Sequence, residues 1–137
     1  MSAIAITAAN VAVSPAAVKT TGIAGVAITA GQAVYQDANG VFQLTNAATS
    51  AVVAQVQGIA LDNAAAGQPL VVVTSDPKFT HGGTTAAGDT IWTSSTSGGI
   101  TKTQGDLVTG VFTAVLGVAI NATQMNLAII APGVAHA

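Results

Sequence analysis

Apolar residues occur along this chain in short runs that are separated by turns rich in Gly, Asn and Pro. The segments 33–36 and 41–44 are two such runs. They flank the sequence DANG at 37–40, in which Asn-Gly supplies the positive φ values that a tight hairpin turn requires. The segments 56–61 and 69–73 follow the same pattern around an Ala/Gly turn. Many short runs at near-regular spacing are typical of small barrels and sandwiches, so the pattern predicts an all-β fold.

The chain also matches itself. Residues 30–44 and 87–103 both begin with Ala-Gly, continue with a short apolar run that holds one aromatic residue, and reach a polar turn that ends in Gly. Residues 56–73 match 115–130 in the same manner. The offset between the copies is 57 positions at the first glycine, and it drifts only in turns, where insertions are tolerated best.

We interpret this pattern as an internal duplication of a roughly four-stranded unit. Two such units would close a small barrel or sandwich with Val, Ile, Leu, Tyr35 and Trp92 inside. Gly58 and Gly117 lie inside predicted strands and indicate bulges or sharp bends, and 46–53 fits one short helix. The predicted single domain (1–137) divides into an extended N-terminal arm (1–24), a first repeat (25–74), a connector (75–86), a second repeat (87–131) and a tail (132–137).

Composition then excludes several classes of protein. Only 6% of the 137 residues are charged, and the chain has no Arg, Glu or Cys. Its lysines, Lys19, Lys78 and Lys102, are scattered, which argues against a nucleic-acid partner. Without Cys there is no disulfide, thiolate metal site or thiol nucleophile, which is compatible with a reducing cytosol. No apolar run approaches the roughly 18 residues of a membrane helix, and we expect neither a secretory signal nor a membrane partner.

The low charge also predicts association. A folded monomer of this mass exposes roughly 6,400 Å², so its eight charged side chains leave about one per 800 Å², which is one partner's share of a standard interface. Free monomers normally stay soluble through a dense mixture of charges. We therefore expect another subunit or a large partner to cover much of the surface.

No catalytic or metal site is predicted. His81 lies in a Gly-rich loop, and the only other histidine is His136. Because zinc sites normally draw three or four ligands, we interpret His81 as a solvated loop residue. Ser14 and Ser50 have no base nearby in the sequence, and the Gly-rich stretches lack the P-loop and G-x-G-x-x-G patterns. The chain is therefore expected to bind no cofactor and to be no enzyme.

The aspartates fit structural roles. Hydrolysis by paired carboxylates would need two of five to converge. In the duplication, however, Asp62 corresponds to Asn121 and Asp89 to Gln32. A side-chain oxygen that accepts hydrogen bonds from turn backbone explains both positions without any charge. The five aspartates are Asp37, Asp62, Asp76, Asp89 and Asp106.

Several of these segments resemble the small capsid cement, or head decoration, proteins of tailed bacteriophages. The resemblance lies in AGQAVYQDANGVFQL at 30–44, in GIALDNA at 58–64 followed by AGQPLVVV at 66–73, and in AGDTIWTS at 87–94 with GVAI at 117–120. It covers most of 25–130 and consists of turn and strand patterns. The long Ala/Thr-rich N-terminal segment departs from the family's pattern.

The resemblance implies a structural virion protein that is made in the host cytoplasm, binds the outer surface of a capsid through the major capsid protein, and stabilises it. It also implies a homo-oligomer, with a trimer favoured. We expect residues 2–20 to form an arm that completes a sheet of the capsid or of a neighbouring molecule. A head fibre base and a carbohydrate-binding adhesion module, which would expose its aromatic residues, stay open as alternatives. The residues expected at the capsid or subunit interface are Ile4, Ile6, Val11, Val13 and Val18.

Overall fold

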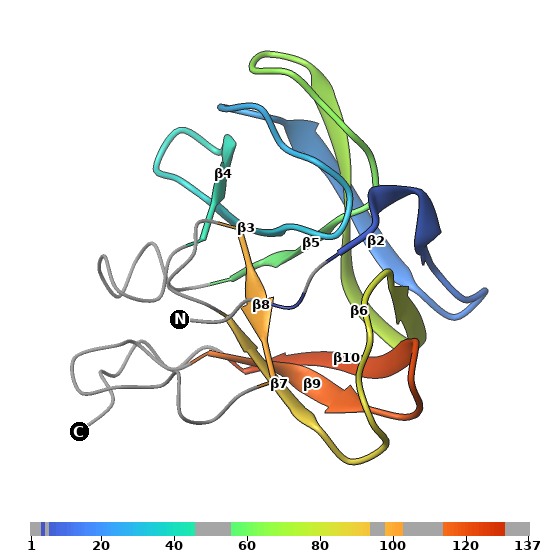
Figure 1. The fold of residues 1–137 in the computed structure, drawn as a ribbon. Coiled ribbons are helices and arrows are strands. Elements are labelled where there is room, and N and C mark those ends of the chain that lie inside the picture. Colours follow the sequence, from blue (N-terminus) through green and yellow to red (C-terminus); the bar gives the residue numbers. More distant parts are fainter. Residues whose placement is uncertain (1–3, 5, 46–55, 94–97, 103–113, 131–137) are drawn as a thin grey trace.

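The computed structural model describes residues 4, 6–45, 56–93, 98–102 and 114–130. In these residues ten strands form one antiparallel sheet that curls into a half-barrel (Figure 1). A single 3-10 turn, η1 (Ala8–Asn10), is the helical element of the described part. The predicted all-β class is confirmed.

The strands are short, with one exception. β6 runs for 13 residues through the middle of the sheet. The strands are β1 (Val11–Ala12), β2 (Val18–Ile23), β3 (Ala33–Gln36), β4 (Phe42–Leu44), β5 (Gly58–Ala60), β6 (Pro69–His81), β7 (Thr90–Thr93), β8 (Ile100–Thr101), β9 (Val115–Ala119) and β10 (Gln124–Ile130).

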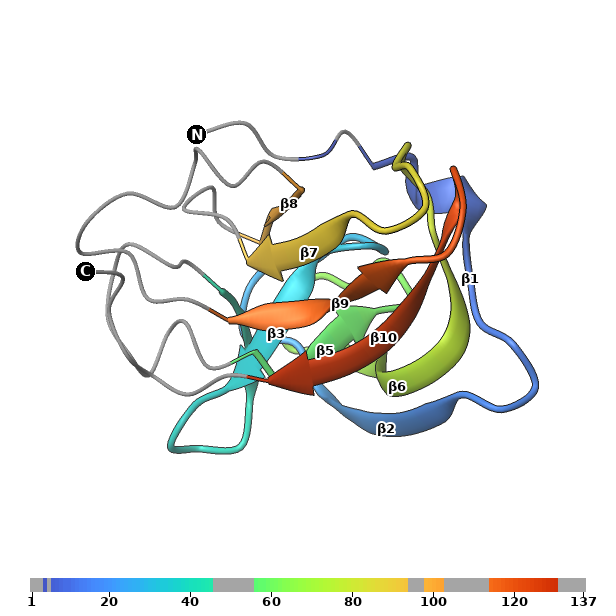
Figure 2. The ribbon, with the colours of Figure 1, turned by 90° about the horizontal axis from the view of Figure 1, so that it is seen from below.

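The long strand β6 joins two halves of the sheet. The strand order is β4-β3-β5-β6-β10-β9-β7-β8. Val73 pairs with Ile59 of β5 and also with β2, while Ser75 pairs with Ala128 of β10 and also with β2. Because a strand has only two edges, β5 and β10 lie one after the other on the same edge of β6, and β2 lies on the opposite edge. Figure 2 shows β7, β9 and β10 side by side in the second half.

The two halves have the same strand order when read outward, β6-β5-β3-β4 and β10-β9-β7-β8. Their registers also agree between the second and third strands of each half: Ala33↔Ile59 and Val34↔Gly58 correspond to Thr90↔Val118 and Ile91↔Gly117. The turns before β3 and β7 match as well, since Gly31 and Gly88 both have φ 92°. This correspondence is what a duplication would produce, and the duplication itself stays a prediction.

The strand β6 continues through much of the predicted connector. The apolar pattern stops after residue 73, yet pairing extends to His81. Asp76 and Phe79 lie opposite Leu127 and Met125, so one extra residue of β6 bulges between them at 77–78. This bulge is where Pro77, which has no N–H to donate, is tolerated.

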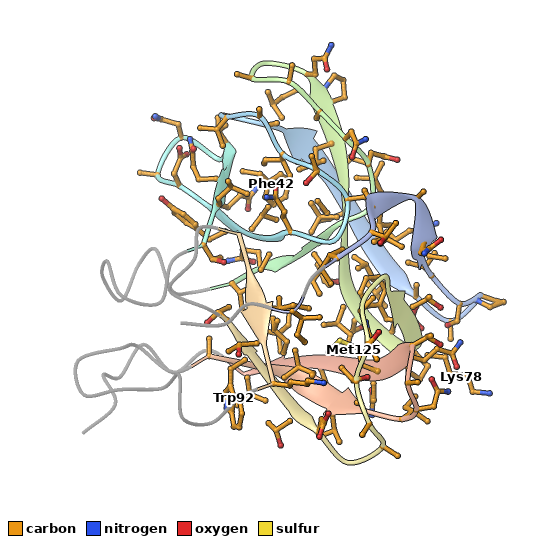
Figure 3. All side chains as sticks on the ribbon, in the orientation of Figure 1. Phe42, Lys78, Trp92 and Met125 are labelled. Carbon is orange, nitrogen blue, oxygen red and sulfur yellow. The ribbon has the colours of Figure 1, made fainter. Side chains whose placement is uncertain are left out.

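Two groups of buried side chains make up the core. The larger cluster lies between the halves, and the smaller cluster lies within the first half, among β3 to β6 and the segment that follows β2. In Figure 3, Met125 belongs to the larger cluster and Phe42 to the smaller one. The larger cluster is Ala33, Val56, Ile59, Val73, Phe79, Ile91, Ile100, Ala114, Leu116, Met125 and Leu127, and the smaller is Ala24, Ile28, Val34, Phe42, Ala60, Ala64, Leu70 and Val72.

The prediction that Tyr35 and Trp92 lie inside the core was wrong. Tyr35 and Trp92 are only half-buried, whereas Phe42 and Phe79 are 1% and 0% exposed. In β7 the buried positions alternate with Trp92, which therefore lies on the outer side of the strand (Figure 3).

The glycines divide into different roles. Of the Asn-Gly pair in the first hairpin, only Gly40 has a positive φ, at 77°. The expectation of two positive φ values is therefore wrong. Gly117 has φ 156° and lies where the registers of β9 with both neighbours shift, as predicted for a bend. Gly58 shows no such shift; a Cβ there would overlap the Val73 carbonyl oxygen, so close approach of the backbones requires it.

Some predictions fall on residues that lie outside the described ranges: the short helix at 46–53, the tail 132–137, Ser50, Asp106 and His136. Among the described residues, no helix has the length and apolar character needed to cross a membrane.

Candidate functional site

The N-terminal segment, residues 4–23, pairs with the chain's own sheet. β1 and β2 are both antiparallel to β6. The Ile4 N–H donates to the Ile100 carbonyl oxygen at 2.7 Å, and the Thr7 N–H donates to the Gly82 carbonyl oxygen at 2.8 Å. These backbone groups therefore have partners within the chain, and the expected pairing of the segment with a neighbouring molecule stays a prediction.

The five residues expected at an interface differ in how far they are buried. Four of them are half-buried and pack against the larger core cluster, which makes them part of the fold. Val18, at the start of β2, is 56% exposed and is the most exposed of the five. The four packed residues are Ile4, Ile6, Val11 and Val13.

A buried carboxylate anchors this segment to β6. Asp76, which is 0% exposed, accepts hydrogen bonds from the Ser14 N–H at 2.8 Å, from the Ser14 hydroxyl, and from the Lys78 N–H at 2.9 Å. Burial alone would raise the pKa of Asp76, but the hydrogen bonds outweigh it and hold the pKa below its ordinary value. Ser14 is thus a structural donor to a carboxylate.

The outer edge of β2 carries backbone groups that point away from the sheet. The Val71 carbonyl oxygen accepts the Leu61 N–H, so it points toward β5. Thr21 lies opposite Val71. Opposite residues in an antiparallel ladder alternate between hydrogen-bonded and non-hydrogen-bonded pairs. Because Val71 bonds to β5, the pair with Thr21 is a non-hydrogen-bonded one, and the Thr21 N–H and C=O point away from β6. Within the described ranges no strand pairs with this edge; beyond it lies the isolated bridge between Ala24 and Phe42.

Exposed apolar side chains accompany this edge. Val18, Ile23 and Val26 are 56%, 43% and 38% exposed, and Lys19 is the charged residue among them. We call Val18, Lys19, Thr21, Ile23 and Val26 the β2 edge surface. The other exposed large hydrophobic residues of the described part, Val118 and Ile120, belong to β9 and the turn after it.

His81 is buried, contrary to the expectation of a solvated loop residue. It is 1% exposed at the end of β6. The Gly83 N–H donates to Nδ1 at 3.0 Å, so Nε2 carries the ring hydrogen and donates to the Thr85 hydroxyl at 3.0 Å. That hydroxyl in turn donates to the Asn121 carbonyl oxygen at 2.8 Å. Burial, and then the charge of Lys102, lower the pKa of His81, so the ring is neutral.

A pocket of about 310 Å³ is lined partly by the chain neighbours of this histidine. The five residues that line it carry amide, hydroxyl and backbone groups, and none of them titrates near neutral pH. They come from segments far apart in the sequence, which is why no sequence pattern pointed to them. The pocket is lined by Asn10, Thr80, Gly82, Gly83 and Thr123.

The turn roles predicted for side-chain oxygens are confirmed at three positions. Gln32 Oε1 accepts the Thr29 N–H and Asp89 Oδ2 accepts the Ala86 N–H, both at 2.8 Å. Asn121 Oδ1 accepts the Gln124 N–H at 2.9 Å.

Two further aspartates lie in turns. Asp62 is exposed, and Asn63 beside it accepts a backbone N–H from another loop. In the first hairpin, the Gln43 amide and the backbone N–H groups of Val41 and Asn39 lower the pKa of Asp37.

The described residues hold no group of three His, Asp or Glu side chains that could bind a metal ion. In the comparisons with known proteins, no protein-family model matches the chain, and no curated protein matches it.

Proposed function

We propose that this chain is a structural virion protein that binds the outer surface of a bacteriophage capsid and stabilises it, docking through the β2 edge surface. The observation that carries the proposal is an open strand edge with exposed apolar residues on a molecule of very low charge. The chain exposes 6113 Å² and has only eight charged residues. The resemblance of residues 25–130 to decoration proteins supports the same function.

Docking at a strand edge suits a protein that stabilises a shell without chemistry. An added strand from the major capsid protein would hydrogen-bond to the outward backbone groups of Thr21, whatever the partner's side chains are. Val18 and Ile23 would then bury apolar area, at about 25 cal/mol per Å² before the costs of association. Repeated over many copies, such contacts reinforce a lattice.

The test is to mix the purified protein with expanded, undecorated capsids and to measure the mass gained by the particles. Thr21→Pro removes the outward N–H but none of the bonds to β6, and Pro is tolerated at such edge positions. We expect this variant and Val18→Asp to lose occupancy at least tenfold. Val118→Asp, a matched change on β9, should bind as the parent does.

The outcomes are distinguishable. If the parent protein adds no mass to any capsid, the function is wrong. If Thr21→Pro and Val18→Asp bind as well as the parent, the capsid function stands but the β2 edge is not the site. Circular dichroism and thermal unfolding must show that each variant is folded. Light scattering after size exclusion measures the oligomeric state, for which we propose a homotrimer.

A glycan-binding module is the second candidate, and the half-buried Trp92 favours it, because an accessible indole can stack on a sugar ring. Trp92 is the only tryptophan, so its fluorescence reports on this position alone. A saturable spectral shift with bacterial surface glycans, lost in Trp92→Ala, would support this candidate. Quenching by acrylamide that glycans leave unchanged would count against it.

A further inference from the structure

His81 is both a buried titratable side chain and the residue with which the N-terminal segment pairs. Val11 of β1 lies opposite His81 in the ladder to β6. One residue on, the Gly82 carbonyl oxygen accepts the Thr7 N–H at 2.8 Å. A Cβ placed on Gly82 would lie 2.7 Å from the Thr7 carbonyl oxygen, so the loop and the segment are in direct contact.

A proton on the ring is incompatible with this arrangement. The neutral ring accepts the Gly83 N–H at Nδ1, whereas a protonated ring carries a hydrogen on both nitrogens. Nδ1–H and the Gly83 N–H would then point at each other. At 1% exposure the ring has no water to solvate its charge.

The groups around the ring do not compensate for the charge. The polar groups within hydrogen-bond reach, from the 83–85 loop and from the β9–β10 turn, are neutral. The charged group that acts on the ring is Lys102, and its charge repels a proton. Protonation therefore requires the loop to move.

We propose that acid detaches residues 7–12 from the sheet: a proton on His81 displaces the 82–83 loop, and with it the hydrogen bond to Thr7 and the pairing of β1. The anchor between Ser14 and Asp76 limits the detachment. Because the pKa of Asp76 lies below its ordinary 3.8, the carboxylate still holds Ser14 at pH 5. Residues from Ser14 onward stay in place, and β2 keeps its pairing.

The sign of the effect follows from linkage. The pKa of His81 is lowered in the closed form, and in the open form the ring returns to about 6.5. The open form therefore binds more protons, and the opening equilibrium grows about tenfold for each pH unit below 6.5, until the closed form itself takes up the proton.

Amide hydrogen exchange on the full chain tests this without any capsid, so its outcome is independent of the proposed function. After correction for intrinsic exchange, protection of the Thr7 amide should fall about tenfold per pH unit between 6.5 and 5. The Leu61 amide, which donates to Val71 in the first half, is the internal control. An unchanged Thr7 amide overturns the proposal.

Two variants assign the effect to the ring. His81→Asn keeps an acceptor for the Gly83 N–H but does not titrate, so Thr7 protection should become independent of pH; the same loss as in the parent overturns the proposal. Lys102→Gln should weaken the acid-driven opening, because without the repulsion the closed form itself takes up the proton at a higher pH. If His81→Asn fails to fold, the ring can be titrated by NMR in the His136→Ala background, where it is the only histidine. Its midpoint must then coincide with the release of Thr7.

Discussion

At the scale of single residues, buried polar groups decide more of this fold than the sequence pattern indicates. Most of them have partners inside the chain, as His81 and Asp76 do. Thr93 is the exception in the described part: its hydroxyl is buried and has no hydrogen-bond partner there. An unpaired buried hydroxyl costs about 1–3 kcal/mol.

Thr93→Val should therefore stabilise the protein by about 1 kcal/mol, because it removes an unpaired hydroxyl and keeps the shape. Urea unfolding measures the difference. Thr45→Val is the matched control, since the buried Thr45 hydroxyl donates to the Ala33 carbonyl oxygen at 3.2 Å. That variant should lose about 1 kcal/mol. A loss at both positions would show that the Thr93 hydroxyl has a partner.

Asp76 sets the expected response to acid. Because its pKa is lower in the folded state than the ordinary 3.8, its contribution to stability is present above pH 3.8 and is lost as the pH falls toward the folded value. Asp76→Asn should lower stability at pH 7 by about 2 kcal/mol, through weaker hydrogen bonds. It should also flatten the decline of stability below pH 4. Chemical denaturation at a series of pH values measures both effects, and an equally steep decline in the variant would contradict this role.

At the scale of elements, the two glycine roles can be separated by mutation. Gly67, with φ 87°, has nothing near the position of its missing Cβ, whereas Gly58 lacks a positive φ but lies against the Val73 carbonyl. Gly67→Ala should cost about 1 kcal/mol for the left-handed conformation alone. Gly58→Ala should cost about 3 kcal/mol, because β5 must move away from β6. Equal losses, measured by thermal unfolding, would contradict the distinction.

The elements also show how far the sequence could be read. The predicted strand at 33–36 is β3, because alternation and the following turn both lie in local sequence. The second part of β6 was missed because Asp76 and Lys78 interrupt the apolar pattern. What makes Asp76 acceptable inside a strand is Ser14, 62 positions earlier, and no local pattern contains that contact. The burial of His81 was missed for the same reason, since Asn121 completes its hydrogen-bond chain.

At the scale of the whole molecule, low charge has a measurable consequence for binding. If apolar contacts and backbone hydrogen bonds hold the protein on a capsid, screening of charges removes little of the attraction. The dissociation constant should change less than about threefold between 50 and 500 mM NaCl. A steep loss of occupancy with salt would indicate that Lys19 and the other charged residues carry the interaction.

The shared strand β6 also has a mechanical consequence. Tension applied along β2 would load its hydrogen bonds to β6 in shear, so that the bonds resist together and do not open one by one. β6 would then pass the load to β5 in one half and to β10 in the other. If the molecule were attached to a shell under internal pressure, the tension would be spread over both halves of its core.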